Sequence, residues 1–262
     1  MGLIGSAIAY GVMFVYALVV RLRRGAASRP RAVGGSGVWV ISNAIVDMYA
    51  VRVSGGVVLF DTGLDPRGRA VDRLLAALDA TRDDVTDVFL THAHPDHVGG
   101  AALLPRARVH AGAADAAFFE RRAGFRHGAV RLFGRLVPAP PVRVDDRVDA
   151  EREIPVGDGT ERVRAIPMPG DTPGALAFLV RRVLVVGDGF VRRGDSFTLS
   201  PSWTLEDPEA NARSVVRLLG RARELAVTHV CTSHGGVGEG GLGGSAFEGL
   251  AREARARAPE AA

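Results

Sequence analysis

Three histidines and one aspartate lie within six consecutive residues, and these side chains together could bind metal ions. They are His92, His94, Asp96 and His97, and they follow an apolar run, Val85–Leu90, that predicts a buried strand. Neutral imidazole is the commonest metal ligand near pH 7, and the aspartate adds an oxygen ligand or a base. A strand that ends in H-x-H-x-D-H can direct ligand pairs at two neighbouring points. The alternative interpretation is a solvated polar loop with chance histidines.

Further polar motifs follow in order, and each comes at the end of an apolar, strand-like segment. They are P-G-D-T-P-G at Pro169–Gly174, V-G-D-G at Val186–Gly189 and T-S-H-G at Thr232–Gly235. Upstream, the apolar run Val57–Phe60 ends in the acidic turn Asp61-Thr62-Gly63. A metal site built from several strand ends needs this arrangement, because side chains from different loops must meet at one edge of a sheet. The order of the motifs therefore favours a metal site.

Taken together, these motifs resemble those of the metallo-β-lactamase-fold hydrolase superfamily, from about Val38 to Gly236. The resemblance implies an α/β fold, an αββα four-layer sandwich in which two mixed sheets face each other and helices cover the outside. It also implies a metal site at one edge of the sandwich. The implied cofactor is one or two zinc ions, with iron as the other possibility.

The resemblance implies a role for each motif residue. His92 and His94 would bind the first metal ion, and Asp96, His97 and His234 would bind the second. Asp188 would bridge the two ions. Asp61 would hold the histidine loop from behind, without touching a metal ion. Asp96 would also orient the nucleophilic water or take its proton, which makes it the candidate catalytic residue.

One position departs from the family pattern. Relatives usually have a histidine where this chain has Asp171. Sites with two histidines and one carboxylate are productive in other zinc hydrolases, so we interpret Asp171 as the third ligand of the first metal. A carboxylate lowers the positive charge of the site and should make bound water less acidic. The alternative is that the first site is weak or empty and Asp171 is a turn residue.

The implied activity is hydrolysis of a small-molecule substrate by a metal-activated water. The electrophile would be an ester, thioester, lactone, amide or phosphoester centre. Asp188 argues against a true β-lactamase, since those members of the fold usually lack an aspartate in the G-D motif. Two alternatives stay open: an iron-dependent oxidoreductase of the same fold, and a membrane-tethered binding protein that has lost turnover through Asp171.

Composition agrees with one enzyme-sized domain, which we assign to residues 38–258. The chain has 262 residues, of which 47% are hydrophobic, enough for one large α/β core. The sequence pI of about 10.1 suits nucleic acid, but the formal net charge is only +4 and no basic run alternates with aromatic residues. Nucleic acid is therefore an unlikely partner. A single cysteine, Cys231, excludes an internal disulfide framework.

The first 24 residues predict a transmembrane anchor. Leu3–Val20 contains no charged residue and is followed by Arg21, Arg23 and Arg24, which is close to the roughly 20 apolar residues that cross a bilayer. The arginines follow the segment, so the positive-inside rule places the next domain in the cytoplasm of a single-pass membrane protein. A cleaved signal peptide is the alternative. Residues 25–37, rich in Gly, Ser and Pro, predict a flexible linker.

Three further segments of the sequence predict helices. Val98–Leu104 predicts a short helix whose first amide groups lie near the metal site. Asp207-Pro208 predicts a capped helix start, with a helix that continues through Leu225. Arg121–Val137 alternates apolar residues with arginines, which fits either an amphipathic lid close to the membrane, over the metal edge, or an ordinary surface helix packed on the sandwich.

Overall fold

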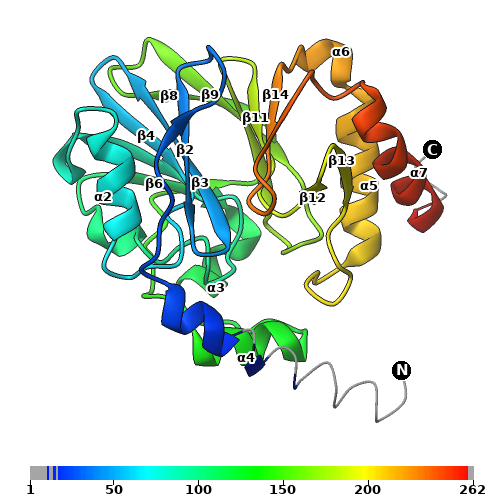
Figure 1. Ribbon diagram of the computed structural model, residues 1–262, viewed down its shortest axis with the longest axis horizontal. Helices are drawn as coiled ribbons and strands as arrows, with labels where there is room; N and C mark the ends of the chain where they lie inside the picture. The colour runs from blue at the N-terminus through cyan, green and yellow to red at the C-terminus, as the bar shows by residue number, and fades with distance from the viewer. Residues whose placement is uncertain (1–10, 12–13, 16, 259–262) are drawn as a thin grey trace.

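Two β-sheets face each other at the centre of the computed structural model, which describes residues 11, 14–15 and 17–258 (Figure 1). Within the described residues, the first sheet has seven strands in sequential order: β1 (Arg31–Ala32), β2 (Val38–Asn43), β3 (Val46–Val53), β4 (Gly56–Phe60), β5 (Val85–Phe89), β6 (Arg108–Gly112) and β7 (Asp146–Val148). Strands β1 to β4 pair antiparallel, and β4 to β7 pair parallel. This sheet is therefore mixed, as the family resemblance implies.

The second sheet is also mixed. In the part of the chain that the structure describes, it has six strands in the order β15-β14-β11-β10-β9-β8. Their bounds are β8 (Arg152–Val156), β9 (Glu161–Pro167), β10 (Leu176–Val180), β11 (Val183–Val185), β14 (His229–Cys231) and β15 (Val237–Glu239). Only β11 and β14 pair parallel. A separate hairpin consists of β12 (Phe190–Arg193) and β13 (Ser196–Leu199).

Helices cover the outer faces of both sheets, so the molecule has four layers (Figure 1). The described helices are α2 (Arg69–Ala76), α3 (Ala116–Phe119), α4 (Gly128–Leu136), α5 (Pro208–Gly220), α6 (Ala222–Leu225) and α7 (Glu248–Arg257), and residues 17–23 are also helical. α2 packs on the first sheet, whereas α5 and α7 pack on the second. α4 and residues 17–23 lie together at one end of the sandwich (Figure 1).

Side chains alternate between the two faces of each strand, and this alternation explains the layers. In β3, Tyr49 and Val51 point into the cluster between the sheets, whereas Met48 and Ala50 point outward toward α2. Both faces of the strand are apolar because both are covered, as expected for strands in the middle of a layered α/β fold. The central cluster includes the rings of Phe60, Phe89 and Phe178, whose centroids lie 5.1–5.9 Å apart.

Strand direction brings the polar motifs to one edge. The parallel strands β4 and β5 end in the loops that carry Asp61 and His92, and the parallel strands β11 and β14 end in those that carry Asp188 and His234. Parallel strands deliver their following loops to the same side of a sheet. Asp171 follows β9 in the second sheet. The two sheets thus present their polar loops to each other at this edge.

The helix predicted for Val98–Leu104 is not present, which corrects that expectation. Only Ala101–Leu103 forms a single 3₁₀ turn. Gly99 passes so close to the loop after β4 that a Cβ there would lie 2.6 Å from the Leu64 carbonyl carbon. This close approach, together with the low helix propensity of two consecutive glycines, keeps the segment in turns. The helix predicted from Asp207-Pro208 does begin there, with Asp207 as its N-cap, and it is interrupted at Gly220.

The segment predicted as a flexible linker, residues 25–37, packs on the domain, which is a second correction. β1 pairs with β2, and Val33 is buried. The Asn43 side-chain amide donates hydrogen bonds to the carbonyl oxygens of Arg24 and Ala26. The first sheet therefore begins at Arg31 rather than at residue 38, because the backbone groups of this segment find partners along the edge of β2.

The predicted transmembrane anchor falls largely on residues 1–10, 12, 13 and 16, which lie outside the described residues. Of the helices that the structure does describe, none has the length and apolar character required to span a bilayer.

Candidate metal centre

Seven side chains from four loops meet at the shared edge of the two sheets, and they form two groups that could hold metal ions. The first group contains His92, His94, Asp171 and Asp188, and the second contains Asp96, His97 and His234. Within each group the candidate ligand atoms lie within 4.8 Å of one another. Every motif residue that the sequence suggested as a metal ligand is thus in one of these groups.

Asp171 lies between the two histidines of the first group. Its Oδ2 atom is 3.0 Å from His92 Nε2 and 3.4 Å from His94 Nδ1. The side chain of Asp171 is 1% exposed, so the residue faces the imidazoles and is not a solvated turn residue. This position is the one that a third ligand would occupy.

Asp188 faces the second group as well as the first. Its Oδ1 atom is 3.6 Å from His97 Nε2, and its Oδ2 atom is 3.2 Å from His234 Nε2. Asp96 closes the second group, with Oδ2 3.7 Å from His97 Nε2 and 3.6 Å from His234 Nε2. These contacts put Asp188 between the groups, in the place of a bridging carboxylate.

Buried polar atoms without a partner support metal binding here. Among the described residues, several atoms of this cluster have no hydrogen-bond partner: Nε2 of His92, His94 and His97, both carboxylate oxygens of Asp171, and Oδ1 of Asp188. A buried polar atom that lacks a hydrogen bond costs about 1–3 kcal/mol. The concentration of such atoms at one point, with nitrogen and oxygen donors suited to divalent metal ions, means that the residues fit a metal centre.

Outer contacts set which ring nitrogen of two histidines faces the centre. His97 Nδ1 lies 2.8 Å from Asp61 Oδ2, and His234 Nδ1 lies 2.7 Å from the carbonyl oxygen of Ile45. Because a carboxylate and a carbonyl only accept, each Nδ1 carries the proton, and each Nε2 offers its lone pair when the ring is neutral. Such partners orient metal-binding histidines and raise their basicity.

Asp61 connects the histidine loop to β4. Its carboxylate accepts hydrogen bonds from the Thr91 backbone N–H and hydroxyl, both at 2.8 Å, in addition to the contact with His97. Asp61 has φ of 57°, in the left-handed region, which costs a non-glycine residue of order 1 kcal/mol. The three bonds maintain this backbone conformation, and in return it holds His97 in place.

Asp115 is a contributor that the sequence reasoning missed. It is buried, and its carboxylate accepts hydrogen bonds from the Thr172 hydroxyl and, at 2.7 Å, from the Gly174 N–H. Gly170 lets the same loop lie against α5, since a Cβ there would be 2.1 Å from the Asn211 nitrogen. Asp115 and Gly170 therefore position Asp171. The only sequence signal for Asp115 was an acid shortly after a strand.

In the absence of metal ions, burial and neighbouring charges shift the pKa values of the histidines in opposite directions. Burial, with a smaller contribution from His97, lowers the pKa of His92 to about 4. Burial also opposes protonation of His97 and His234, but the carboxylates beside them, Asp188 first, raise the pKa to about 10 for His97 and about 9 for His234. The first group would thus meet a metal ion as neutral imidazoles, whereas the second would first have to release protons.

Metal loading should therefore depend steeply on pH. At pH 7 both His97 and His234 are protonated in the metal-free protein, and a metal ion must displace these protons. We expect the apparent affinity of the second site to rise between pH 7 and pH 9, by about tenfold per pH unit for each displaced proton. Zinc titrations against a competing chelator at several pH values, with proton release followed in weak buffer, measure this. An affinity that does not change with pH would contradict the assignment of these histidines.

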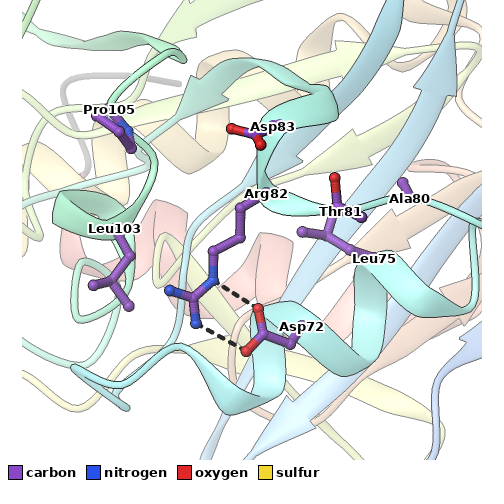
Figure 2. Close-up of a pocket in the computed structure, with 8 residues that line it drawn as sticks. All are labelled: Asp72, Leu75, Ala80, Thr81, Arg82, Asp83, Leu103 and Pro105. Carbon is purple, nitrogen blue, oxygen red and sulfur yellow. Dashed lines mark hydrogen bonds and ion pairs between the residues drawn. The ribbon is translucent and has the colours of Figure 1, made fainter.

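A separate surface hollow of about 610 Å³ lies away from the metal centre, beside α2 (Figure 2). Arg82 and Asp72 form a two-point ion pair across it, with N–O distances of 2.7 and 2.8 Å. None of its lining residues belongs to the metal-binding groups. The hollow therefore has no part in the candidate site.

Comparison with known proteins agrees with this geometry. The sequence profile of the metallo-beta-lactamase superfamily matches residues 43–234. A probable metallo-hydrolase of Mycobacterium tuberculosis is 31% identical over 175 residues, which cover 55% of this chain and 56% of that protein. Metallo-beta-lactamase domain-containing protein 1 of Rattus norvegicus is 30% identical over 176 residues, which cover 66% of this chain and 61% of that protein. The chain thus spans less than two thirds of the length of these relatives.

Solved structures show the same architecture. A metallo-beta-lactamase from Cronobacter sakazakii, mutated in its HARLDQ motif, superposes with a TM-score of 0.62 and 26% identity, over 79% of this chain and 80% of that one. The superfamily profile covers both candidate metal-binding groups, from the histidine loop to His234. On its sequence and its fold, this chain belongs to the metallo-beta-lactamase superfamily.

Proposed function

We propose that this protein is a zinc-dependent hydrolase that cleaves an ester, thioester, lactone or phosphoester bond in a small molecule. The observation that supports the proposal most strongly is the cluster of buried, unpartnered nitrogen and carboxylate atoms from His92, His94, His97, Asp171 and Asp188. Their place at the loop edge of a metallo-hydrolase fold agrees with it. Bound metal ions would supply a Lewis acid that acidifies water and polarises the electrophilic oxygen of the substrate.

In this proposal, the protein's own residues divide the work. Asp171 completes the first site with His92 and His94, and Asp188 bridges to the second. Asp96 lies within 3.7 Å of both His97 Nε2 and His234 Nε2, so it would help to hold the second metal and could also orient the attacking water or hold its proton. Phe125, whose ring centroid is 5.0 Å from that of His94, gives the centre one apolar wall against which part of a substrate would pack.

The substitution at Asp171 makes the two sites alike. Each contains two imidazoles and one carboxylate of its own, and they share Asp188. Three carboxylates beside two divalent ions leave a lower positive charge than a site with a third imidazole, and the two sites offer the same kinds of ligand atom to a metal ion. The set of two histidines and one carboxylate also suits iron, which supports an iron-dependent oxidoreductase as the second candidate function.

Metal analysis combined with an activity screen tests the proposal. The full chain should be purified without chelators, its metal content measured by mass spectrometry, and each bound ion identified by anomalous scattering. We expect two zinc ions per chain and hydrolysis of at least one ester, thioester, lactone or phosphoester class, lost on chelation and restored by zinc. Iron at both sites without any hydrolysis would favour the oxidoreductase, and full metal loading without turnover would favour a binding protein.

Asp171→His should tighten the first metal site. Imidazole is a softer donor than carboxylate and better matched to zinc, and the family's usual residue is restored in a loop that Asp115 already holds. We expect the variant to keep zinc in a chelator concentration that strips the parent protein. Asp195→Asn, an exposed change on the β12–β13 hairpin, serves as the control. Weaker zinc retention than the parent would mean that Asp171 is an adapted ligand that histidine cannot replace.

We also propose a single-pass anchor in residues 1–24, with the catalytic domain in the cytoplasm and no nucleic-acid partner. The uncharged run Leu3–Val20 and the arginines after it support this. The full-length protein should resist carbonate extraction from membranes, and its domain should be protected from protease added outside intact cells. Carbonate-soluble protein, or a domain digested from outside, would overturn the proposal.

A further inference from the structure

The helix of residues 17–23 and α4 lie together as a two-helix layer at one end of the sandwich (Figure 1). Ala17 and Val20 are buried in one cluster with Phe133 and Val137 of α4. The Arg21 guanidinium donates a hydrogen bond of 3.2 Å to the carbonyl oxygen at the end of α4. The two helices therefore pack as one unit on the domain, and we refer to residues 14, 15 and 17–24 together with α4 as the two-helix layer.

This layer contacts the histidine loop itself. A carbon built at the Cβ position of Gly134 would lie 3.5 Å from Pro95 Cγ, inside the H-A-H-P-D-H motif. Phe125, just before α4, places its ring on His94 at a centroid distance of 5.0 Å. A surface that binds the outer side of the two-helix layer would therefore lie next to the metal centre.

The outer side of this layer exposes large apolar side chains. Phe14, Val15, Leu18, Val19 and Leu22 are 44–78% exposed, and within the described residues only Trp203 joins them among the large exposed hydrophobics. The spacing 14, 18, 22 places side chains on one helix face, opposite the buried Ala17 and Val20. Soluble monomers rarely leave such groups together in water, and their clustering marks an interaction surface.

The same layer is strongly basic. Residues 14–24 and 128–136 of the sequence contain five arginines, Arg21, Arg23, Arg24, Arg131 and Arg135, and no aspartate or glutamate. Arg131 and Arg135, one turn apart on α4, are exposed. Among the described residues, neither forms an ion pair, and the same is true of Arg21, Arg23 and Arg24. Unpaired arginines beside exposed apolar groups complement an anionic lipid surface.

We propose that the two-helix layer docks on an anionic bilayer and holds the metal-centre edge against the membrane. The exposed apolar side chains enter the interfacial region, and the arginines bind lipid headgroups. This contact is an alternative to the bilayer-crossing anchor, because Ala17 and Val20 are buried against α4 and cannot at the same time lie in the hydrocarbon core. Nucleic acid would leave the apolar face in water, and a second copy of the chain would place arginines against arginines. Anionic lipid satisfies both features.

Vesicle binding of the full chain tests this proposal. Flotation is measured with vesicles of phosphatidylcholine alone and with about 30 mol% phosphatidylserine, an anionic lipid. Arg131→Gln/Arg135→Gln should bind the anionic vesicles about 30-fold more weakly than the parent, since each arginine near such a surface contributes about fivefold, with no change on neutral vesicles. The matched control is Arg252→Gln/Arg255→Gln, which removes two exposed arginines from α7, on the outer face of the second sheet.

Hydrogen exchange of the α4 backbone amides gives a second measurement, which a membrane anchor alone would not change. The amides of Gly128–Leu136 should exchange more slowly with anionic vesicles present, and this protection should disappear in the Arg131→Gln/Arg135→Gln variant. Equal binding of parent and variant to both vesicle types would overturn the proposal, as would tighter binding of the parent to RNA than to anionic vesicles. A dimer whose formation buries Leu18 and Leu22 would overturn it too. None of these outcomes depends on turnover, so failure of the proposed hydrolase activity is distinguishable.

Discussion

Replacing Asp188 by asparagine should empty both metal sites and abolish metal-dependent turnover. Asp188 is the one side chain that belongs to the first group and also lies within 3.6 Å of both histidine Nε2 atoms in the second. A neutral amide keeps the shape but loses the charge that draws a divalent ion. Loss of an outer-shell partner weakens metal binding by about 10–100-fold, and a direct, shared ligand should cost more than that.

The same substitution should destabilise the metal-free protein at pH 7. The buried imidazolium groups of His97 and His234 would lose their main counter-charge, because Asp188 is the first carboxylate to raise the pKa of each. Breaking a buried ion pair from one side costs on the order of 3 kcal/mol. Metal content, turnover and denaturant unfolding should be measured together, with Asp195→Asn as the exposed control. Retention of two metal ions per chain would refute the bridging role.

His94→Ala should remove the first metal and metal-dependent activity while the fold persists. His94 lies in the loop after β5, and the structure records its contacts with other members of the centre and with the half-buried Phe125. Its ring is not part of the apolar clusters between or outside the sheets. Truncation therefore leaves the core intact but deletes an imidazole ligand of the first site.

Circular dichroism and metal content measured on the same sample separate the two effects. We expect an unchanged spectrum, about half the parental metal content, and no detectable turnover. His229→Ala is the matched control, since His229 is half-buried on β14 and its Nδ1 contacts only the neighbouring Thr228 hydroxyl. A His94→Ala protein with full metal content and full activity would show that His94 is not a ligand.

The sequence by itself predicted the strands that precede the site motifs and, through the family resemblance, the seven residues that the structure brings together. The apolar runs before the motifs became β4, β5, β9, β11 and β14, and the predicted runs Val57–Phe60 and Val85–Leu90 match β4 and β5 to within one residue at each end. Such runs are local signals, because burial on both faces of a strand requires apolar side chains at consecutive positions. The seven motif residues then met because each one follows a strand whose end lies at the same edge.

Local signals failed where a distant segment decided the conformation. Val98–Leu104 has helix-forming residues, but Gly99 must pass against Leu64, so turns replace the helix. Residues 25–37 have a linker composition, but the edge of β2 and the Asn43 amide supply partners for their backbone. In both places the competing contact comes from elsewhere in the chain and outweighs weak local propensities.

Only the tertiary structure determined which groups position the candidate ligands through hydrogen bonds. His234 Nδ1 meets the carbonyl oxygen of Ile45, 189 positions away, and Asp115 holds the loop of Asp171 from 57 positions away through Thr172. A backbone carbonyl has no side-chain signature, and a lone aspartate after a strand resembles many surface acids. The pairing of residues 17–23 with α4 has the same origin. These contacts form because two layered sheets bring remote loops to one edge, and that proximity is a property of the packed chain rather than of any local stretch of sequence.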